Sequence, residues 1–255
     1  MHVRRWILLM LACVAASACY PIRDTSKAPA LRRLAAEQAP RRAVLVLPGI
    51  GDNLDSLQAG GIGDAIRAAW PDADVVLVEL TIGYYKDGRA MPDLHALVAE
   101  ESGRHAEVWL VGASLGGMGA LLYDAAYPCE VDGIVLLAPY LGEDATLRQI
   151  RDAGGLARWQ APPAATPDAG NWQGQLWRRA KVWASGGGDP RVWLAWGADD
   201  KFAPNMPLLL PAVPPSHVVA GDGVHAWRSW TPLARQAFAM AAREPRSPRS
   251  ACPTP

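Results

Sequence analysis

A serine with a glycine two residues to either side is the feature of this sequence that most clearly predicts chemistry. The motif G-A-S-L-G occupies residues 112–116 and follows the apolar run Val108–Val111. A serine on such a tight strand-to-helix turn has strained backbone angles, and side chains two residues away would collide with the turn. The turn exposes the hydroxyl at the carboxyl edge of a parallel sheet, where ligands bind. We therefore predict Ser114 as a nucleophile and the backbone N–H of Leu115 as a donor to an oxyanion.

A nucleophilic serine needs a base, and the base needs a carboxylate that orients it. Two later loops can supply them, because each follows a predicted strand and so reaches the same sheet edge as Ser114. The first loop contains Asp199 and Asp200, and the second contains His225. The other four histidines precede the serine or begin a strand: His2, His95, His105 and His217. We therefore predict His225 as the base.

The elements that must position these residues follow from alternating apolar runs and amphipathic stretches. This alternation predicts an α/β fold, with a mostly parallel central sheet flanked by helices, in one domain over residues 43–242. The predicted strands are Ala43–Leu47, Val75–Leu80, Val108–Val111, Ile134–Ala138, Val192–Trp196 and His217–Ala220. The predicted helices are Ser56–Trp70, Asp93–Ser102, Leu115–Tyr127 and Trp227–Ala242.

Composition limits the classes of function. The chain has 255 residues, half of them hydrophobic, which is enough for one large core. Its 25 basic and 25 acidic residues cancel, so no basic field exists to hold nucleic acid. The four cysteines show no metal-ligand spacing, and no metal or organic cofactor is implied.

The region from about residue 142 to 190 interrupts the alternation and is rich in proline, glycine and tryptophan. Its tryptophans are Trp159, Trp172, Trp177 and Trp183. One interpretation is a Trp-rich cap inserted over a pocket, and the other is a long surface excursion whose tryptophans pack on the core. The sequence leaves both open.

The N-terminus has the pattern of an export signal. Two arginines precede the apolar run Trp6–Val14, and small residues lead to Cys19. The segment A-S-A-C at 16–19 resembles the bacterial lipobox, although that motif prefers leucine where Ala16 stands. We expect residues 1–18 to be a signal peptide and Cys19 to be lipidated, which would place the mature protein on the periplasmic side of a bacterial membrane. An ordinary signal peptide cut at the same bond is the alternative.

Two further segments are predicted to lie outside the packed domain. Residues 19–42 are polar and mixed, which is typical of a tether. Residues 243–255 are rich in proline, serine and arginine, which predicts a disordered tail. In an exported protein Cys129 and Cys252 could pair.

The motifs together resemble the α/β-hydrolase superfamily, and in particular its esterase D and feruloyl-esterase-like branch. The segment G-A-S-L-G-G-M-G-A at 112–120 resembles the nucleophile turn of that branch. The residues H-A-W at 225–227, with Trp230, resemble its terminal His-x-Trp segment. The resemblance runs from about residue 43 to 242 and is poor through 142–190. It implies the α/β-hydrolase fold, with a triad in the chain order serine, aspartate, histidine.

The resemblance also selects between the two aspartates. The acid loop of the family commonly reads glycine, two residues and aspartate, with proline four positions further on. Gly197 and Pro204 fit this spacing only for Asp200, so Asp199 is interpreted as a solvated loop charge or a turn cap. Relatives often carry His-Gly after the first strand, whereas this chain has L-P-G-I-G at 47–51. We expect this turn to present the Ile50 N–H as a second oxyanion donor, and the alternative is an ordinary turn.

The expected function is therefore hydrolysis of a small-molecule carboxylic ester or thioester through an acyl-enzyme. An acyltransferase on the same scaffold uses the same triad, so the sequence does not separate the two activities. A third possibility, from another class, is a non-catalytic surface lipoprotein that kept the fold for binding. The sequence does not indicate the acyl chain, the alcohol or the oligomeric state.

Overall fold

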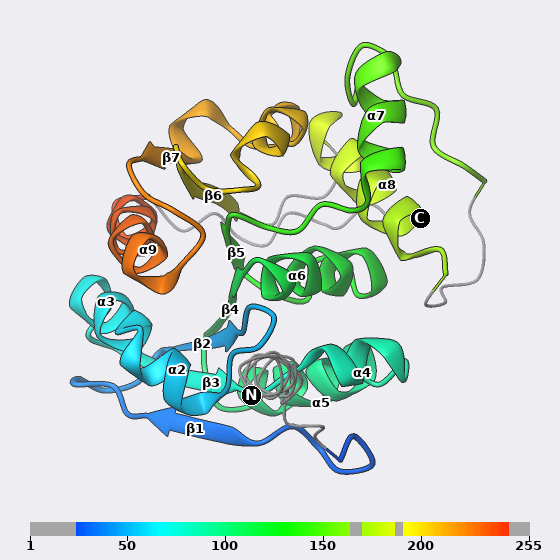
Figure 1. Cartoon of the computed structure of the whole chain (residues 1–255). Coiled ribbons are helices and arrows are strands. Elements are labelled where there is room, and N and C mark those ends of the chain that lie inside the picture. The colour runs from blue at the N-terminus through cyan, green and yellow to red at the C-terminus, as the bar shows by residue number, and fades with distance from the viewer. Residues whose placement is uncertain (1–23, 164–169, 187–190, 245–255) are drawn as a thin grey trace, which may run out of the picture.

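A seven-stranded, mostly parallel sheet forms the centre of the molecule (Figure 1). The computed structural model describes residues 24–163, 170–186 and 191–244. In these residues the strand order is β1-β3-β2-β4-β5-β6-β7, and only β1 runs antiparallel to its neighbour. The strands are β1 (Leu31–Leu34), β2 (Arg42–Leu47), β3 (Ala73–Val78), β4 (Glu107–Ala113), β5 (Gly133–Leu137), β6 (Arg191–Gly197) and β7 (Val218–Gly221).

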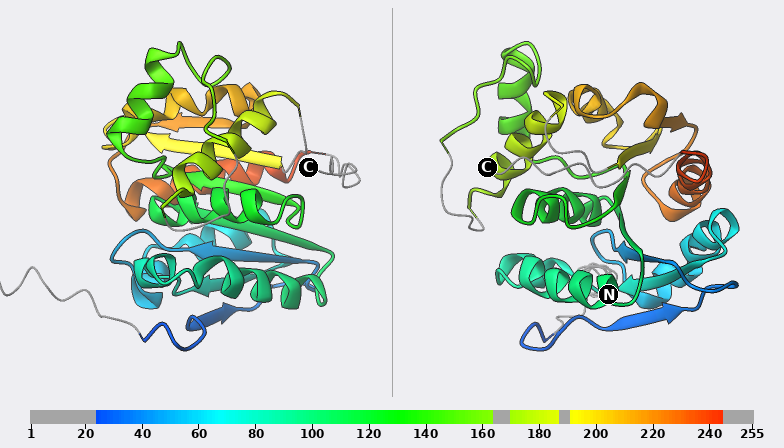
Figure 2. Two further views of the ribbon diagram at one scale, coloured as in Figure 1. Left: turned by 90° about the vertical axis from the view of Figure 1, so that its right-hand side faces the viewer. Right: turned by 180° about the vertical axis from the view of Figure 1, so that it is seen from behind.

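Helices cover both faces of the sheet, as the view from behind also shows (Figure 2). One face packs on α3 (Ile62–Ala69) and α9 (Trp227–Ala241), and the other on α5 (Ala90–Ser102) and α6 (Leu115–Ala126). Alternate residues of β2 face the two layers, with Leu45 on the α6 side and Val44 on the α9 side. Burial on both faces explains why the central strands are continuous apolar runs. The predicted α/β class and parallel sheet are confirmed.

The predicted helix Ser56–Trp70 is in fact two helices, α2 (Leu54–Ala59) and α3. The break falls at Gly60-Gly61, where Gly61 has a φ of +71°. Asn53 caps α2 by accepting a hydrogen bond from the Ser56 N–H. Outside the region 142–190, further helical segments were not predicted: α4 (Ile82–Lys86) and the 3-10 helices 203–208, 210–212 and 215–217.

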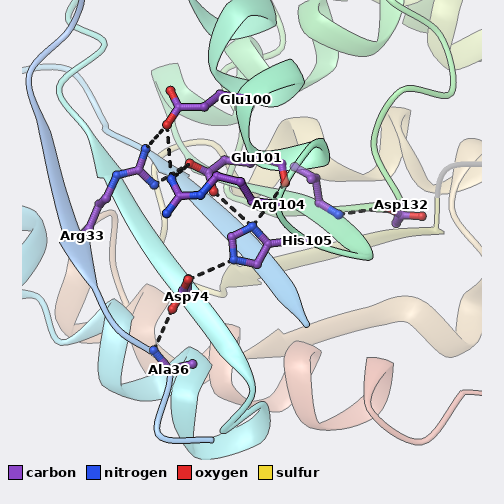
Figure 3. A network of polar contacts seen from close by, with 9 residues as sticks. Arg33, Ala36, Asp74, Glu100, Glu101, Arg104, His105 and Asp132 are labelled. Atoms are coloured by element: carbon purple, nitrogen blue, oxygen red, sulfur yellow. Dashed lines mark hydrogen bonds and ion pairs between the residues drawn. The ribbon is translucent and has the colours of Figure 1, made fainter. Parts of the chain in front are cut away.

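The predicted tether over residues 19–42 is wrong for the part that the structure describes, because this part contains β1. Arg33 of β1 forms ion pairs with Glu100 and Glu101 at the end of α5 (Figure 3). Beside them, Asp74 of β3 accepts a hydrogen bond from the Ala36 N–H at 2.8 Å. Polar residues that suggest a solvated linker thus attach an edge strand to the domain.

The region 142–190 contributes two helices, α7 (Asp144–Asp152) and α8 (Trp172–Ala184), and α8 packs along α6. Three of its tryptophans, Trp159, Trp177 and Trp183, are buried in the core on that side of the sheet. These three side chains agree with the interpretation in which the tryptophans pack on the core. Trp172, at the start of α8, is half-buried and lies 5.8 Å from the ring of Tyr140.

The ends of the chain are described only in part. Glu244, just after α9, bonds His217, so the predicted disordered tail does not begin at residue 243. Residues 245–255, the signal segment 1–18 and Cys19 lie outside the described residues. Cys129 is disulfide-bonded. The other three cysteines lie outside the residues that the structure describes, so the pairing of Cys129 with Cys252 stays a prediction. No helix in the described part of the chain is long and apolar enough to cross a lipid bilayer.

Candidate active site

Ser114 occupies a strained turn between β4 and α6. Its backbone angles are φ 52° and ψ −110°, in the positive-φ region that residues with a side chain rarely adopt. A Cβ added to Gly112 would lie 2.2 Å from the Gly116 carbonyl oxygen, and one added to Gly116 would lie 2.3 Å from the Leu47 carbonyl oxygen. Both glycines are therefore required by close approach of the backbone, which explains the predicted motif.

The structure brings together the three residues predicted to form a triad. His225 Nε2 lies 2.9 Å from Ser114 Oγ, and His225 Nδ1 lies 2.7 Å from Asp200 Oδ1. A carboxylate only accepts hydrogen bonds, so Nδ1 carries the proton and Nε2 is free to accept from the serine hydroxyl. This is the arrangement that lets an imidazole remove a proton from serine.

The Asp200 carboxylate is buried and accepts three hydrogen bonds. Its Oδ1 also accepts from the Phe202 N–H at 2.9 Å, and its Oδ2 accepts from the Trp230 indole at 3.1 Å. Burial raises the pKa of Asp200, but the hydrogen bonds from His225, the Phe202 N–H and Trp230 outweigh burial and hold the pKa below its usual value. The neighbouring Asp199 is exposed, as expected for a loop charge.

The loops that carry Asp200 and His225 are fixed to each other through their backbones. The Asp199 N–H donates to the Gly223 carbonyl at 3.0 Å, and a Cβ on Gly197 would lie 2.2 Å from that same oxygen. The His225 ring is also held edge-on by the rings of Phe202 and Trp230, with centroids 4.7 and 4.6 Å away. The imidazole therefore has little freedom to turn away from Ser114.

The two residues predicted as oxyanion donors, Leu115 and Ile50, belong to segments that lie next to the serine. Leu115 is the first residue of α6, where backbone N–H groups have no partner within the helix. On the other side, Gly49 lies close to the serine, since a Cβ built on it would lie 3.7 Å from Ser114 Cβ. Ile50 follows Gly49, and 52% of its surface is exposed. The turn at 47–51 thus lies beside the serine.

Sequence reasoning missed several residues around this site. Asp52 bonds the turn at 47–51, and the Phe202 ring packs on the imidazole. Trp230 was part of the predicted His-x-Trp segment, but its contact with the imidazole was not predicted. Tyr140 follows β5, donates its N–H to the Ser114 carbonyl at 2.9 Å, and lies 5.5 Å from the Phe202 ring. The position of Tyr140 after a strand is the one signal that could have identified it. Within the described ranges, no group of three or more His, Cys, Asp or Glu residues is arranged to hold a metal ion.

The sheet order, the strained serine after β4 and the loops after β6 and β7 define the α/β-hydrolase fold. A family model described as serine aminopeptidase, S33, matches residues 83–202, a span that includes Ser114 and Asp200. The comparison with curated protein sequences finds no match.

Solved structures of hydrolases are similar to this chain in fold. An S-formylglutathione hydrolase from Staphylococcus aureus is 11% identical, with a TM-score of 0.58 and coverage of 85% of this chain and 98% of that one. A monoacylglycerol lipase from Paleococcus ferrophilus is 15% identical, with a TM-score of 0.56 and the same coverages, 85% and 98%. A ferulic acid esterase is 14% identical, with a TM-score of 0.58 and coverages of 86% and 94%. At these identities the likeness shows the fold, and the chain has the α/β-hydrolase fold.

Proposed function

We propose that this protein is a serine hydrolase that cleaves carboxylic esters or thioesters, with Ser114, His225 and Asp200 as its triad. The observation that carries the proposal is the continuous hydrogen-bond chain from the serine hydroxyl to the buried carboxylate, at 2.9 and 2.7 Å. The match to a serine peptidase family model and the fold shared with lipases and esterases support a serine hydrolase of the esterase type.

The proposed reaction begins when His225 takes the Ser114 proton as the serine oxygen bonds to the carbonyl carbon. Asp200 stabilises the imidazolium, and the N–H groups of Leu115 and Ile50 stabilise the oxyanion. When the tetrahedral intermediate collapses, the bond to the leaving group breaks and that group takes the proton from His225. Water then gives a proton to His225 and its oxygen bonds to the acyl carbon. When this second intermediate collapses, the bond to the Ser114 oxygen breaks, His225 returns the proton to that oxygen, and the acid is released.

Two measurements test the proposal. Wild-type protein should react with a fluorophosphonate probe, which labels only an activated serine, and should hydrolyse nitrophenyl esters of graded acyl length. Ser114→Ala should remain folded, lose labelling, and lose about 10³-fold or more in kcat, because only oxyanion and binding contributions remain. Full turnover by the purified variant would refute the mechanism.

The same assays separate the alternatives. Transfer of the acyl group to an added alcohol in preference to water would indicate an acyltransferase. Cleavage of aminoacyl nitroanilides but not of esters would indicate an aminopeptidase. A wild-type protein that neither labels nor turns over any substrate would indicate a non-catalytic binding protein.

We also propose that the mature protein is exported and anchored by a lipid at Cys19. The order of arginines, an apolar run and small residues before this cysteine supports the proposal. Two or three acyl chains on one cysteine would hold the protein firmly on a membrane, which a single chain does not.

A further inference from the structure

Asp52 lies behind the turn at 47–51 and accepts three hydrogen bonds from three different segments. Its Oδ2 accepts from the Gly49 N–H at 2.9 Å and from the Trp227 indole at 2.8 Å. Its Oδ1 accepts from the Ser56 hydroxyl at 3.0 Å. Hydrogen bonds to an ionised carboxylate are stronger than those between neutral groups. The carboxylate therefore joins the turn, the start of α2 and the start of α9.

These bonds decide which N–H of the turn is available to an oxyanion. The Asp52 side chain occupies the Gly49 N–H, and the Asp52 N–H donates back to the Gly49 carbonyl at 3.2 Å. Both the N–H and the carbonyl of Gly49 are therefore bonded to Asp52, in a position close to Ser114. Because the Gly49 N–H is taken and Pro48 has none, the N–H groups that this turn can still offer are those of Ile50 and Gly51, and Ile50 is the one adjacent to Gly49.

The partner of Asp52 on α9 connects the turn to the triad. Trp227 and Trp230 are three residues apart on one helix, and their rings meet edge to face with centroids 5.3 Å apart. The Trp227 indole donates to Asp52, and the Trp230 indole donates to Asp200. One helical turn therefore fixes the oxyanion turn and the triad acid relative to each other.

We propose that Asp52 is a positioning residue that sets the Ile50 N–H against the oxyanion and, through Trp227, keeps this turn in register with the triad. The inference rests on the proposed serine hydrolase function. Asp52 is not needed to cap α2, because the neighbouring Asn53 already does so through a reciprocal bond with Ser56. Its Oδ1 accepts from the Ser56 hydroxyl, and its Oδ2 is directed at the turn and at the indole.

The test compares Asp52→Ala, Asp52→Asn and Trp227→Phe on a nitrophenyl ester. Asp52→Ala frees the turn, and we expect kcat to fall roughly 10- to 100-fold with KM within about threefold, because small misplacements of an oxyanion donor cost this much. Asp52→Asn keeps an acceptor oxygen for Gly49 and should recover most of kcat. Trp227→Phe removes only the indole donor and should lower kcat by less than Asp52→Ala.

The matched control is Asp55→Ala, which removes an exposed carboxylate of α2 that pairs with Arg32 at the surface. It should keep wild-type kcat. Combining Asp52→Ala with Trp227→Phe should cost little more than Asp52→Ala alone, because both remove the same connection. Independent, additive losses would show that the indole and the carboxylate do not act together.

The outcome separates this inference from the function on which it rests. If Ser114→Ala abolishes labelling but Asp52→Ala and Trp227→Phe keep wild-type kcat, the positioning role is refuted and the hydrolase proposal stands. The positioning role is equally refuted if Asp52→Ala raises KM and leaves kcat unchanged. If the wild type is not labelled at all, the function itself is refuted. Should Asp52→Ala fail to fold, Trp227→Phe decides the question, because wild-type kcat in that variant would refute the link between the turn and the triad.

Discussion

The indole N–H of Trp230 donates to Oδ2 of Asp200 at 3.1 Å, so the carboxylate oxygen that does not bond His225 is also occupied. With both oxygens bonded, the acid is held in one orientation in a buried environment. This arrangement ties the ionisation of Asp200, and not only its position, to a residue on α9.

Replacing Trp230 with phenylalanine should make the fold more sensitive to acid. Burial raises the pKa of Asp200, but its hydrogen bonds hold the pKa below its usual value. The loss of one hydrogen-bond donor therefore moves the pKa upward. A carboxyl group whose pKa is lower in the folded state than in the unfolded state stabilises the folded state at pH values above the unfolded-state pKa. This stabilisation is lost as the pH falls through the folded-state pKa. The variant should therefore lose stability at higher pH than the wild type.

Urea unfolding midpoints measured from about pH 2 to pH 6 would show this difference. Trp172→Phe is a suitable control, because it makes the same substitution at a half-buried tryptophan whose ring packs near Tyr140. Superimposable acid profiles for Trp230→Phe and the wild type would contradict the prediction.

The adjacent aspartates should behave very differently. Asp200→Asn removes the carboxylate that orients and stabilises the imidazolium, and should lower kcat about 10³- to 10⁴-fold. Asp199→Asn changes an exposed loop charge and should cost less than about tenfold. Both should be assayed at one pH near 8, where imidazoles are mostly neutral. If Asp199→Asn were the inactive variant, Asp199 and not Asp200 would be the acid of the triad.

The buried ion pair between Asp124 of α6 and Arg179 of α8 should be important for stability. Asp124 also accepts from the Trp183 indole at 3.1 Å. Asp124→Ala removes the carboxylate that pairs with the buried Arg179 guanidinium. The variant should lower the free energy of unfolding by about 3–5 kcal/mol, because a buried charge loses its partner. Urea denaturation gives this value directly. Asp152→Ala, at an exposed position, should change the free energy of unfolding by no more than about 0.5 kcal/mol. Equal losses in the two variants would contradict a special role of the buried ion pair in stability.

Cys19 should decide where the mature protein is found. Metabolic labelling with a clickable palmitate should mark the wild type and not Cys19→Ser, and the wild type should fractionate with membranes. An unlabelled wild-type protein in the soluble periplasm would contradict lipidation and leave the ordinary signal peptide.

Much of the fold was predictable because its determinants are local. The apolar strands and the glycines around Ser114 follow from burial on two faces and from steric limits within a few residues of sequence. The loops after β6 and β7 were predicted from the rule that parallel strands end at one edge. The catalytic roles of Ser114, Asp200 and His225 stay predictions until the variants are assayed.

The contacts that sequence reasoning missed join segments that are distant in the sequence. Asp52 and Trp227 are 175 positions apart, so neither suggests the other. The edge strand β1 reads L-R-R-L and is half-exposed, so its local pattern resembles that of a solvated linker. In α8 a buried arginine, Arg179, interrupts the apolar face, and its partner on α6 is not apparent from the local pattern.

The contact between Gly197 and Gly223 restricts how this sequence can diverge. A Cβ on Gly197 would lie 2.2 Å from the Gly223 oxygen and would separate the loops that carry Asp200 and His225. A Cβ on Gly223 would lie 2.4 Å from the hydroxyl of Ser229, the residue of α9 that accepts a hydrogen bond from the Val224 N–H of the His225 loop. The exposed Asp199 and Asp222 on the same two loops carry no such restriction. In a library that randomises both loops, surviving clones should therefore keep the two glycines as strictly as the triad, while positions 199 and 222 drift.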